Sequence, residues 1–389
     1  MSLPQCLLKR ACLAAALACA GVGAHAASHD FVYVGTYTSG TSSQGIYVFD
    51  FNLANGSAAA PTLAGATADP SFLEVHPNGR SLYAVDETDS FNGMHDTGGV
   101  SAFAITASTG HLSLLDSQPT RGGGPAYVGL DHSGTHALVA NYDGGNVAVF
   151  PIAADGSLGA STGFAQDTGH GPTADQDGPH AHIMVAAPDD RYALVADLGA
   201  DKVYSYKLDD AAGTLDPANS PVRKTAAGAG PRHLTFGANG KFVYVLNEIN
   251  STVATYSYAA KKGTLKALQT VSTLPAGFSG SNTGAEIALH PNGKFLYTSN
   301  RGQNAIAVFA IDAATGLLTL KETVSTQGKN PRGFAIDPTG AWLIAANQTT
   351  NTVVTFAVDG STGHLTATGT PITVAAPVCV KFLPRAGTE

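Results

Sequence analysis

One pattern occurs six times along the chain, and it limits the fold more than any other feature of the sequence. Each copy has a short apolar strand, a turn nine residues after its first residue, and a returning strand. The clearest copy is PRHLTFGANGKFVYVLNE, residues 231–248, in which alternating apolar residues flank Asn239-Gly240, a typical hairpin turn. The copies begin at Pro70, Pro125, Ala181, Pro231, Gly284 and Pro331.

Most copies continue beyond the hairpin into a third and a fourth strand. The third strands end in aromatic or apolar pairs, as in Val149-Phe150 and Val308-Phe309. A turn such as Asp155-Gly156 then leads into the short fourth strand. Four short strands that repeat about every 50 residues are typical of a β-propeller blade. The sequence therefore predicts an all-β propeller.

The two ends of the chain hold the parts of one more blade. Residues 377–384, PVCVKFLP, match a first strand that nothing follows. Residues 31–52 match a second and a third strand that no first strand precedes. Joining them leaves no unpaired inner edge in the ring, which would otherwise invite aggregation. We therefore predict a seven-bladed β-propeller whose seventh blade is closed by the N- and C-terminal strands.

The first 26 residues are predicted to be a signal peptide. Lys9-Arg10 precede the apolar run 11–22, and Ala24-His25-Ala26 fits a small-x-small cleavage site. The run is too short to span a membrane. Cys19 leaves a lipoprotein as an alternative, although the residues before it fit a lipobox poorly. We expect export to the periplasm or beyond, no membrane span, and one propeller domain over residues 27–389.

Charge and cysteine content exclude several classes of protein. The net charge of −8 becomes −10 once the two cations of the signal are removed, and no basic run is present, so nucleic acid is not an expected partner. Cys379 would be the sole cysteine left, which excludes an intramolecular disulfide and favours a small buried residue. The Gly-rich tracts 122–124 and 144–145 open no helix and so indicate no phosphate-binding loop. We expect a monomer without a cofactor.

Functional residues are expected where the repeat departs from its own pattern. In an antiparallel hairpin the start of one strand lies about 5 Å from the end of the other. The first strand of each blade lines the central channel, so residues one and seventeen places after each start should ring one mouth of that channel. The first column holds Ser71, Ala126, His182, Arg232, Ala285, Arg332 and Val378. The second column holds Glu87, Tyr142, Leu198, Glu248, Arg301 and Gln348, with Thr36 in the split blade.

These columns combine an acid–base residue, a carboxylate and cations in neighbouring blades. They contain three of the eight arginines that follow the predicted signal, which indicates an anionic ligand because Arg binds carboxylate or phosphate bidentately. His182, Arg232, Glu248 and Arg301 form a contiguous arc, followed by Arg332. Hydrolysis of an ester or lactone needs such a set: a base to activate water, donors for the oxyanion, and an acid for the leaving oxygen.

Structural explanations of the same residues remain open at this point. Arg232 and Glu248 share a hairpin and could form a structural ion pair, and His182 could be a polar residue at a strand start. Arg332 is expected to be a supporting charge, and Glu87 has no cationic neighbour in its arc. Arg232 and Arg301 are expected to hold the carbonyl oxygen or an anionic group, while His182 and Glu248 share the proton transfers, and either could be the base. If His182 is the base, its ordinary pKa of about 6.5 predicts an ionisation at about pH 6–7.

The segment before the third copy, GHGPTADQDGPHAH, residues 169–182, is rich in His and Asp. His180 and His182, together with Asp175 or Asp177, have a spacing that could bind a metal. No second His pair stands at a matching spacing elsewhere. We therefore favour a polar loop and predict no metal.

Four segments resemble the propeller-type lactonase family, which includes bacterial 6-phosphogluconolactonases and fungal carboxy-muconate lactonising enzymes. The segments are GPRHLTFGANGKFVYVLNE, LVANYDGGNVAVFPI, AEIALHPNGKFLYTSNRG and NPRGFAIDPTGAWLIAANQ. The resemblance covers essentially all of the chain after the signal, and it implies seven blades and cofactor-independent lactone chemistry. The family's proposed active-site residues, the His of PHxH, the Arg of GPRH, the Glu of NE and the Arg of SNR, correspond to His182, Arg232, Glu248 and Arg301. His180 is the competing histidine.

The sequence departs from the family at one point that bears on the substrate. The family often carries a basic residue before the Gln that precedes PHAH, whereas Asp175 stands before Gln176 here. This departure and the export signal both argue against phosphate recognition. We expect an exported lactonase that opens a sugar-type lactone bearing a carboxylate, a phosphate or several hydroxyls. The substrate-binding candidates are Arg332, His180, Glu87 and Gln348.

Two other functions stay open. The same residues could run the reverse reaction, as a muconate-type lactonising cycloisomerase. The chain could instead be a non-catalytic exported propeller that binds a ligand at its mouth.

Overall fold

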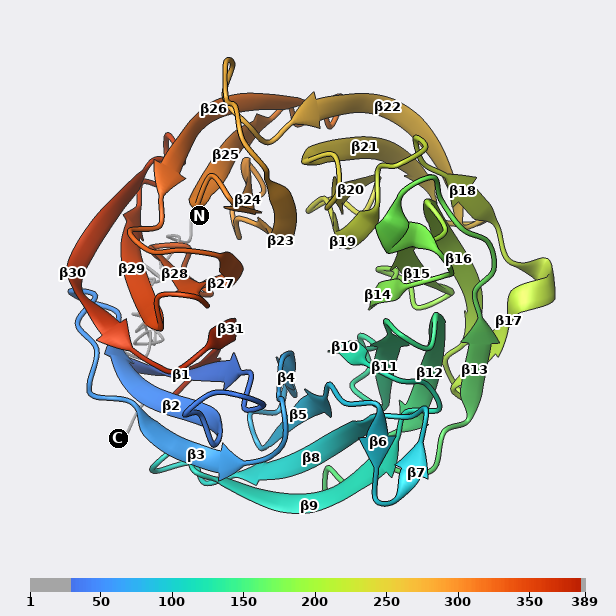
Figure 1. Cartoon of the computed structure of the whole chain (residues 1–389), viewed down its shortest axis with the longest axis horizontal. Coiled ribbons are helices and arrows are strands. Elements are labelled where there is room, and N and C mark those ends of the chain that lie inside the picture. Colours follow the sequence, from blue (N-terminus) through green and yellow to red (C-terminus); the bar gives the residue numbers. More distant parts are fainter. Residues whose placement is uncertain (1–28, 386–389) are drawn as a thin grey trace, which may run out of the picture.

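The structure, a computed structural model, describes residues 29–385 and shows a ring of seven antiparallel sheets (Figure 1). The seven-bladed propeller predicted from the repeat is therefore confirmed. No helix in this described range is long and apolar enough to cross a membrane. The predicted signal peptide, residues 1–26, lies outside the described residues.

Each blade has four main strands, which are listed here from the innermost outward, while their labels follow the order of the chain. Blade 1 contains β4 (Leu73–Val75), β5 (Ser81–Asp86), β8 (Gly99–Ile105) and β9 (Leu112–Pro119). Blade 2 contains β10 (Pro125–Leu130), β11 (His136–Asn141), β12 (Asn146–Pro151) and β13 (Gly163–Gln166). Blade 3 contains β14 (Ala181–Ala186), β15 (Tyr192–Asp197), β16 (Lys202–Asp209) and β17 (Thr214–Asp216), and β18 (Val222–Lys224) also pairs with β16.

The remaining blades repeat this order. Blade 4 contains β19 (Pro231–Phe236), β20 (Phe242–Asn247), β21 (Thr252–Ala259) and β22 (Thr264–Ser272). Blade 5 contains β23 (Thr283–Leu289), β24 (Phe295–Arg301), β25 (Ala305–Ile311) and β26 (Leu318–Ser325). Blade 6 contains β27 (Pro331–Ile336), β28 (Trp342–Asn347), β29 (Thr352–Val358) and β30 (Leu365–Thr373). Blade 7 contains β31 (Pro377–Pro384), β1 (His29–Thr36), β2 (Gly45–Asn52) and β3 (Thr62–Ala66).

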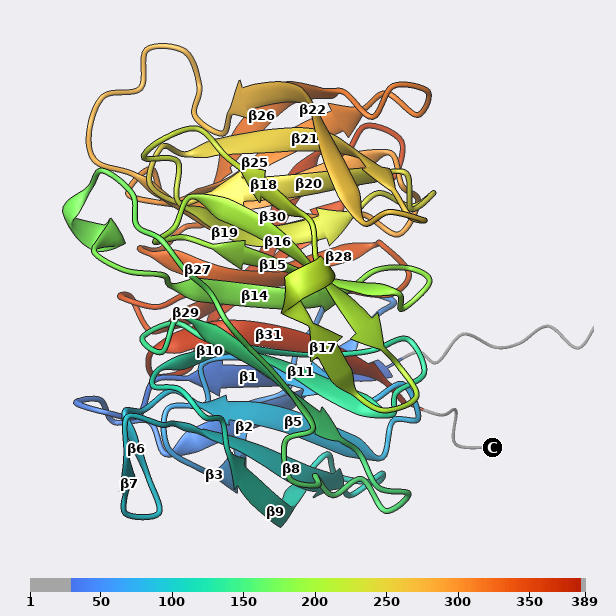
Figure 2. The same cartoon turned by 90° about the vertical axis from the view of Figure 1, so that its right-hand side faces the viewer.

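The short elements outside the blades lie in the loops. They are the hairpin β6 (Ser90–Phe91) and β7 (Met94–His95), and the 3-10 turns η1 (Ala174–Gln176) and η2 (Pro217–Asn219). We call the face at which the innermost strands begin the entry face. The segment that holds η1 and the loop between β22 and β23 both project from this side of the ring (Figure 2).

Both ends of the chain close the ring, as predicted. The C-terminal strand β31 pairs antiparallel with β1, from Asp30 opposite Pro384 to Thr36 opposite Pro377. Cys379 on this strand is buried, and burial raises the pKa of its thiol to about 12, so it is an inert core residue.

Tyrosines on second strands tie neighbouring blades together. Four fully buried hydroxyls each donate to the carbonyl of a turn glycine in the next blade. The bonds are Tyr33 to Gly110 at 2.8 Å, Tyr83 to Gly156 at 3.0 Å, Tyr244 to Gly316 at 3.1 Å and Tyr297 to Gly363 at 2.9 Å. Each bond satisfies a buried hydroxyl and a buried carbonyl. Neighbouring blades are therefore held in one relative position by directional hydrogen bonds as well as by apolar packing.

A β-bulge interrupts the first hairpin of most blades at its entry-face end. On β19, Pro231 pairs with Asn247 and His233 pairs with Leu246, so Arg232 between them has no partner. The same shift occurs at the starts of β10, β14 and β27, and it leaves Ala126, His182 and Arg332 unpaired. A bulge bends the strand and re-aims the extra side chain.

A buried Asn or Asp stands sixteen residues after each repeat start, just before the second column. Three of these asparagines donate from Nδ2 to the carbonyl of a threonine that follows the preceding blade, each at 2.9 Å. The pairs are Asn141 to Thr120, Asn300 to Thr273 and Asn347 to Thr326. These bonds tie the end of each of these second strands to the segment that connects the preceding blade to its own blade. They therefore fix the position of the second-column residue that follows each asparagine.

We predict that a chain ending at Ala376 loses its cooperative thermal transition and self-associates. Without β31, the inner edge of β1 is unpaired and available to another chain. Circular dichroism melting and size-exclusion chromatography would test this, with a chain ending at Arg385 as the matched control. A truncated protein that stays monomeric and melts within about 5 °C of the control would contradict it.

Candidate active site

An arginine–glutamate–arginine bridge joins blades 4 and 5 at the entry face. Arg232 Nε lies 2.8 Å from Glu248 Oε2, and Arg301 Nη2 lies 2.8 Å from Glu248 Oε1. Glu248 follows β20 and Arg301 ends β24, so each residue stands at the blade end that the columns indicated. The carboxylate therefore holds one guanidinium on each oxygen.

The two guanidinium groups are also held by the backbone of β23. Arg232 Nη1 donates to the carbonyl of Ala285, and Arg301 Nη2 donates to the carbonyl of Gly284 at 3.1 Å. The N–H bond of Arg232 Nε is not aligned with the carboxylate, and Arg301 Nε has no partner among the described residues. The arginines are thus fixed in position while part of their donor capacity stays unused.

A second charged pair extends the cluster through blades 6, 7 and 1. Arg332 Nη2 lies 3.8 Å from Glu87 Oε2, and the Tyr37 hydroxyl donates to both Glu87 oxygens at 2.9 and 3.0 Å. Arg332 also lies 5.3 Å from the centre of the Tyr37 ring. The expectation that Glu87 lacks a cationic neighbour is therefore wrong, because Arg332 is long enough to reach past the split blade.

The charges of the cluster leave a positive excess. Three guanidinium groups face two carboxylates, a net charge of +1. Burial favours the neutral acid of Glu248, but Arg301 and Arg232 outweigh it and hold the pKa of that carboxyl below its ordinary value. Burial, together with the like charges of Arg332 and Arg301, lowers the pKa of Arg232 to about 9. At neutral pH the entry face therefore attracts an anion or a developing oxyanion.

His182 lies beside this cluster and is only 4 % exposed. Its ring meets Tyr142 edge-on at 5.5 Å and His233 at 5.0 Å. Burial comes first among the effects on His182, and with the nearby charges of Arg232 it holds the pKa of the imidazole well below its usual range. His182 is therefore neutral at pH 7, and the ionisation expected at about pH 6–7 is placed too high because that expectation ignored burial.

His180, the competing histidine, belongs to the rim rather than to the cluster. Its Nδ1 lies 2.9 Å from the carbonyl oxygen of Tyr142, and its Nε2 lies 3.2 Å from Asp177 Oδ1. Its ring stacks on Tyr142 at 4.5 Å. Both nitrogens of His180 are thus engaged, whereas His182 is the histidine that lies near enough to Arg232 for its charge to affect the imidazole pKa.

The other loop and rim candidates have local partners. Asp175 is exposed, and the buried Gln176 donates to the carbonyl of Leu198 at 2.8 Å. Gln348 Oε1 accepts from Asn330 at 2.9 Å, and no hydrogen bond or ion pair within residues 29–385 joins Gln348 to the arginine cluster. Its predicted contact with substrate stays a prediction.

The alternative of a metal site in the His-rich loop requires His180 and His182 to share an aspartate. Of the two histidines, only His180 contacts one, Asp177, within the described residues. His180 lies 3.2 Å from Asp177, but the His182 ring packs against Tyr142 and His233 and meets no aspartate in this part of the chain. Within residues 29–385, Asp131, His136 and Asp210 are the group whose ligand atoms lie within 4.8 Å of one another. Asp131 accepts hydrogen bonds from Thr135 and His136 across the turn between β10 and β11, so we interpret this group as stabilising that turn.

Tyr142 and Tyr37 contact the cluster, at His182 and Glu87, although neither was selected from the sequence. Burial, with Glu248 next in effect, raises the pKa of Tyr142 to about 12, which keeps its hydroxyl protonated beside the cluster. Tyr142 stands in the second column, so its position could have identified it. A single tyrosine, however, does not by itself indicate a catalytic role. Tyr37 stands one residue beyond that column, and its contact with Glu87 depends on how the split blade sits.

This fold and this site define a seven-bladed β-propeller with an enzyme-like cluster of His, Arg and Glu at one face of the ring. Residues 31–382 match the family described as Lactonase, 7-bladed beta-propeller, and the chain belongs to that family.

Relatives and solved structures agree with this assignment. A protein named 6-phosphogluconolactonase from Bacillus subtilis is 38% identical over 351 residues, which cover 90% of this chain and 97% of the relative. One of the same name from Formosa agariphila is 35% identical, over 78% of this chain and 86% of its own. The solved structure of a Pseudomonas aeruginosa periplasmic gluconolactonase is similar with a TM-score of 0.85 and 34% identity, covering 92% of this chain and 100% of that one.

We predict that Glu248→Ala destabilises the protein more than Glu87→Ala does. Both glutamate side chains are 20% exposed, but Glu248 neutralises Arg232, which is only 2% exposed, and Glu87 faces an arginine that is 17% exposed. Removing one partner of a buried pair costs about 3–5 kcal/mol, because the other charge stays buried alone. Denaturant unfolding would measure both variants. Equal losses in the two variants would contradict this account of the bridge.

Proposed function

We propose that this protein is an exported hydrolase that opens a sugar-type lactone at the entry face of its ring. Membership of the lactonase family supports the reaction class. The observation that carries the proposal is the carboxylate of Glu248 held between Arg232 and Arg301 beside the neutral His182. That set supplies a base and fixed cationic donors in one buried place, as ester or lactone hydrolysis requires.

In the mechanism we propose, His182 is the base. A neutral imidazole takes a proton from water while the water oxygen bonds to the lactone carbonyl carbon. The bond to the ring oxygen then breaks, and the protonated His182 returns the proton to that oxygen. The product is a hydroxy acid, which loses its acid proton to solvent at neutral pH. Each turnover therefore consumes one water and restores His182.

The arginines stabilise the charge that forms between these steps. Arg232 and Arg301 are held by Glu248 and by the backbone of β23, so they need little reorganisation when the carbonyl oxygen becomes an oxyanion. Glu248 keeps its negative charge and is a weak base because its pKa is lowered. We assign it the role of positioning the two guanidinium groups.

The substrate class follows from the charge of the cluster. A net charge of +1 favours a lactone that carries an anionic group or several hydroxyls, and Arg332 with Glu87 provides the outer contacts. The relatives named above include both a 6-phosphogluconolactonase and a periplasmic gluconolactonase. The exposed Asp175 on the loop and the predicted signal peptide favour the unphosphorylated substrate.

A hydrolysis panel tests this function. We expect the protein after residue 26 to open an unphosphorylated aldonolactone at least as fast as its phosphorylated form, with and without a chelator. The panel should include the open-chain muconate-type acid, whose cyclisation would instead indicate a lactonising enzyme. Turnover of none of these compounds would refute the proposed function.

We predict that His182→Ala lowers kcat/KM by about 10²–10⁴, the usual worth of a general base. His132→Ala is the matched control and should retain activity, because His132 follows the far end of β10 and its exposed side chain pairs with Asp190 at 2.7 Å. If the two variants lose activity equally, His182 is not the base.

The pH profile gives a separate prediction. Neutral His182 is the active form, and its folded pKa is lowered, so activity is lost only as the pH falls through that lowered value. We expect kcat/KM to stay level from about pH 8 down to pH 6.5 and to fall at lower pH. A limb centred on pH 6.5 would mean that His182 titrates as if it were exposed, which would contradict its assigned burial.

A further inference from the structure

A second histidine and a carboxylate stand behind His182, and the mechanism above does not use them. His233 follows Arg232 on β19, and its Nδ1 lies 2.9 Å from Glu286 Oε1 on β23. Glu286 also accepts the backbone N–H of Ile287 at 2.9 Å. Burial favours its neutral acid, but His233, Arg232 and the hydrogen bonds that the carboxylate accepts together lower the pKa of Glu286, so the carboxylate is ionised. An ionised carboxylate can only accept, so Nδ1 of His233 carries the proton of this bond.

The other nitrogen of His233 is left as an acceptor. The residue is 1% exposed, and its ring is packed edge-on by Phe72 at 5.7 Å and Tyr127 at 5.8 Å. Burial lowers the pKa of His233, so its ring is neutral with one N–H, and that N–H already faces Glu286. Its Nε2 is buried and has no hydrogen-bond partner within residues 29–385. An unpaired buried acceptor is costly unless a partner reaches it.

The nearest candidate for that partner is His182. The two rings meet edge to face with their centres 5.0 Å apart, and Nδ1 of His182 is likewise buried without a partner among the described residues. The two unpaired nitrogens therefore belong to rings in contact, although they make no direct hydrogen bond. One water between them would satisfy both nitrogens.

We propose that Glu286 and His233 are positioning residues that fix the tautomer of His182, with Nε2 of His233 accepting, through one bridging water, a hydrogen bond from Nδ1–H of His182. This assignment leaves Nε2 of His182 as the free base toward the arginines. The inference rests on the proposed function, since it deepens the role of His182. A carboxylate that fixes one histidine tautomer is a recurring device of acid–base sites.

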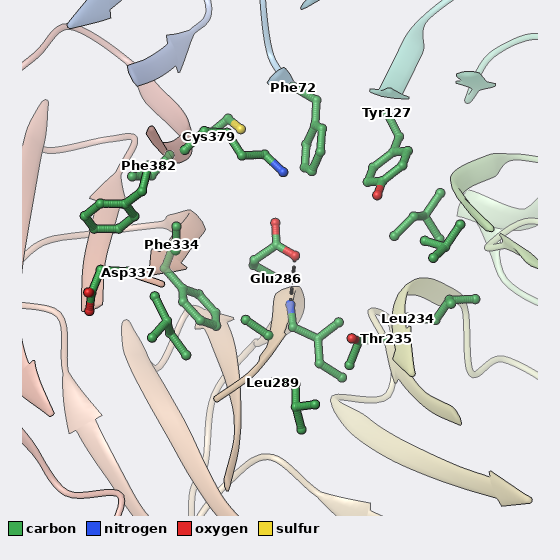
Figure 3. A pocket seen from close by; sticks show the side chains of 18 of the residues that line it. Phe72, Tyr127, Leu234, Thr235, Glu286, Leu289, Phe334, Asp337, Cys379 and Phe382 are labelled. Carbon is green, nitrogen blue, oxygen red and sulfur yellow. Dashed lines mark hydrogen bonds between the residues drawn. The ribbon is translucent and has the colours of Figure 1, made fainter. Parts of the chain in front are cut away.

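Glu286 also lines a cavity on the other side of the pair. Glu286 lines a cavity of about 450 Å³ with Phe72, Tyr127, Phe334 and Cys379, among other residues (Figure 3). Other lining residues, such as Pro291 and Pro338, follow the far ends of inner strands, so this cavity opens on the face opposite the entry face. The hydrogen-bonded pair therefore stands between the catalytic cluster and that cavity.

The kinetic test compares two positioning variants with one control. Glu286→Gln keeps an acceptor near His233 but removes the charge, and His233→Phe keeps the ring packing but removes both nitrogens. Each should lower kcat by about tenfold or more and leave KM nearly unchanged, because neither residue contacts substrate. Glu74→Gln is the control, since Glu74 is another channel carboxylate but pairs with Lys381 at 2.6 Å. Its kcat should match that of the wild type.

His233→Phe alone strands the Glu286 charge, so a variant that does not fold is replaced by the double variant His233→Phe/Glu286→Gln, which removes both polar partners together. The double variant should show the same loss of kcat as the single ones, because all three break the same chain of contacts.

A measurement independent of turnover separates this inference from the proposed function. Nitrogen-15 NMR of the histidine side chains should show His182 protonated at Nδ1 in the wild type and in Glu74→Gln, and a mixture of tautomers in the Glu286 and His233 variants. Wild-type tautomers in every variant, or a kcat unchanged in Glu286→Gln and in the double variant, would overturn the positioning role and leave the lactonase proposal intact. Absence of lactone turnover with the expected tautomer change would refute the function alone.

Discussion

An extra residue at the start of the innermost strands is the constraint on which the site depends. In a regular strand Arg232 and His233 would alternate between opposite faces of the sheet. The bulge breaks this alternation, so Arg232 reaches Glu248 while His233 stays in register with Leu246 and faces Glu286. One local irregularity thus places both Arg232 in the arginine–glutamate cluster and His233 in the pair behind it.

The side chains that the bulges turn inward can meet because hydrogen bonds between blades fix the blade ends at the entry face relative to one another. Buried asparagines such as Asn300 bind the chain crossing that precedes their own blade, and tyrosines such as Tyr244 bind the next blade. Arg301, one residue beyond Asn300, is thereby fixed against Glu248 from the neighbouring blade. Buried ion pairs of this kind contribute little net stability, since desolvation offsets the attraction. We therefore regard the cluster as a device for placing charge.

The fold could be predicted almost fully from the sequence, because a repeat states the same hairpin many times and errors in one copy are corrected by the others. The gathering of His182, Arg232, Glu248 and Arg301 followed from the same count. The expectations that were wrong depended on burial, which lowers the pKa of His182, and on distances between blades. The expectation that Glu87 has no cationic partner considered only adjacent blades, whereas Arg332 reaches Glu87 from two blades away. His233 and Glu286 were missed because the bulge, which no residue type announces, is what turns them inward.

The central claim, that one face of the ring binds the lactone between the arginines and His182, is tested most directly by a crystal structure with a lactam analogue that cannot be hydrolysed. The account predicts the analogue at the entry face, with its carbonyl oxygen on Arg232 or Arg301 and its carbonyl carbon facing Nε2 of His182. Density for the analogue only in the cavity beside Glu286 on the opposite face would contradict the account.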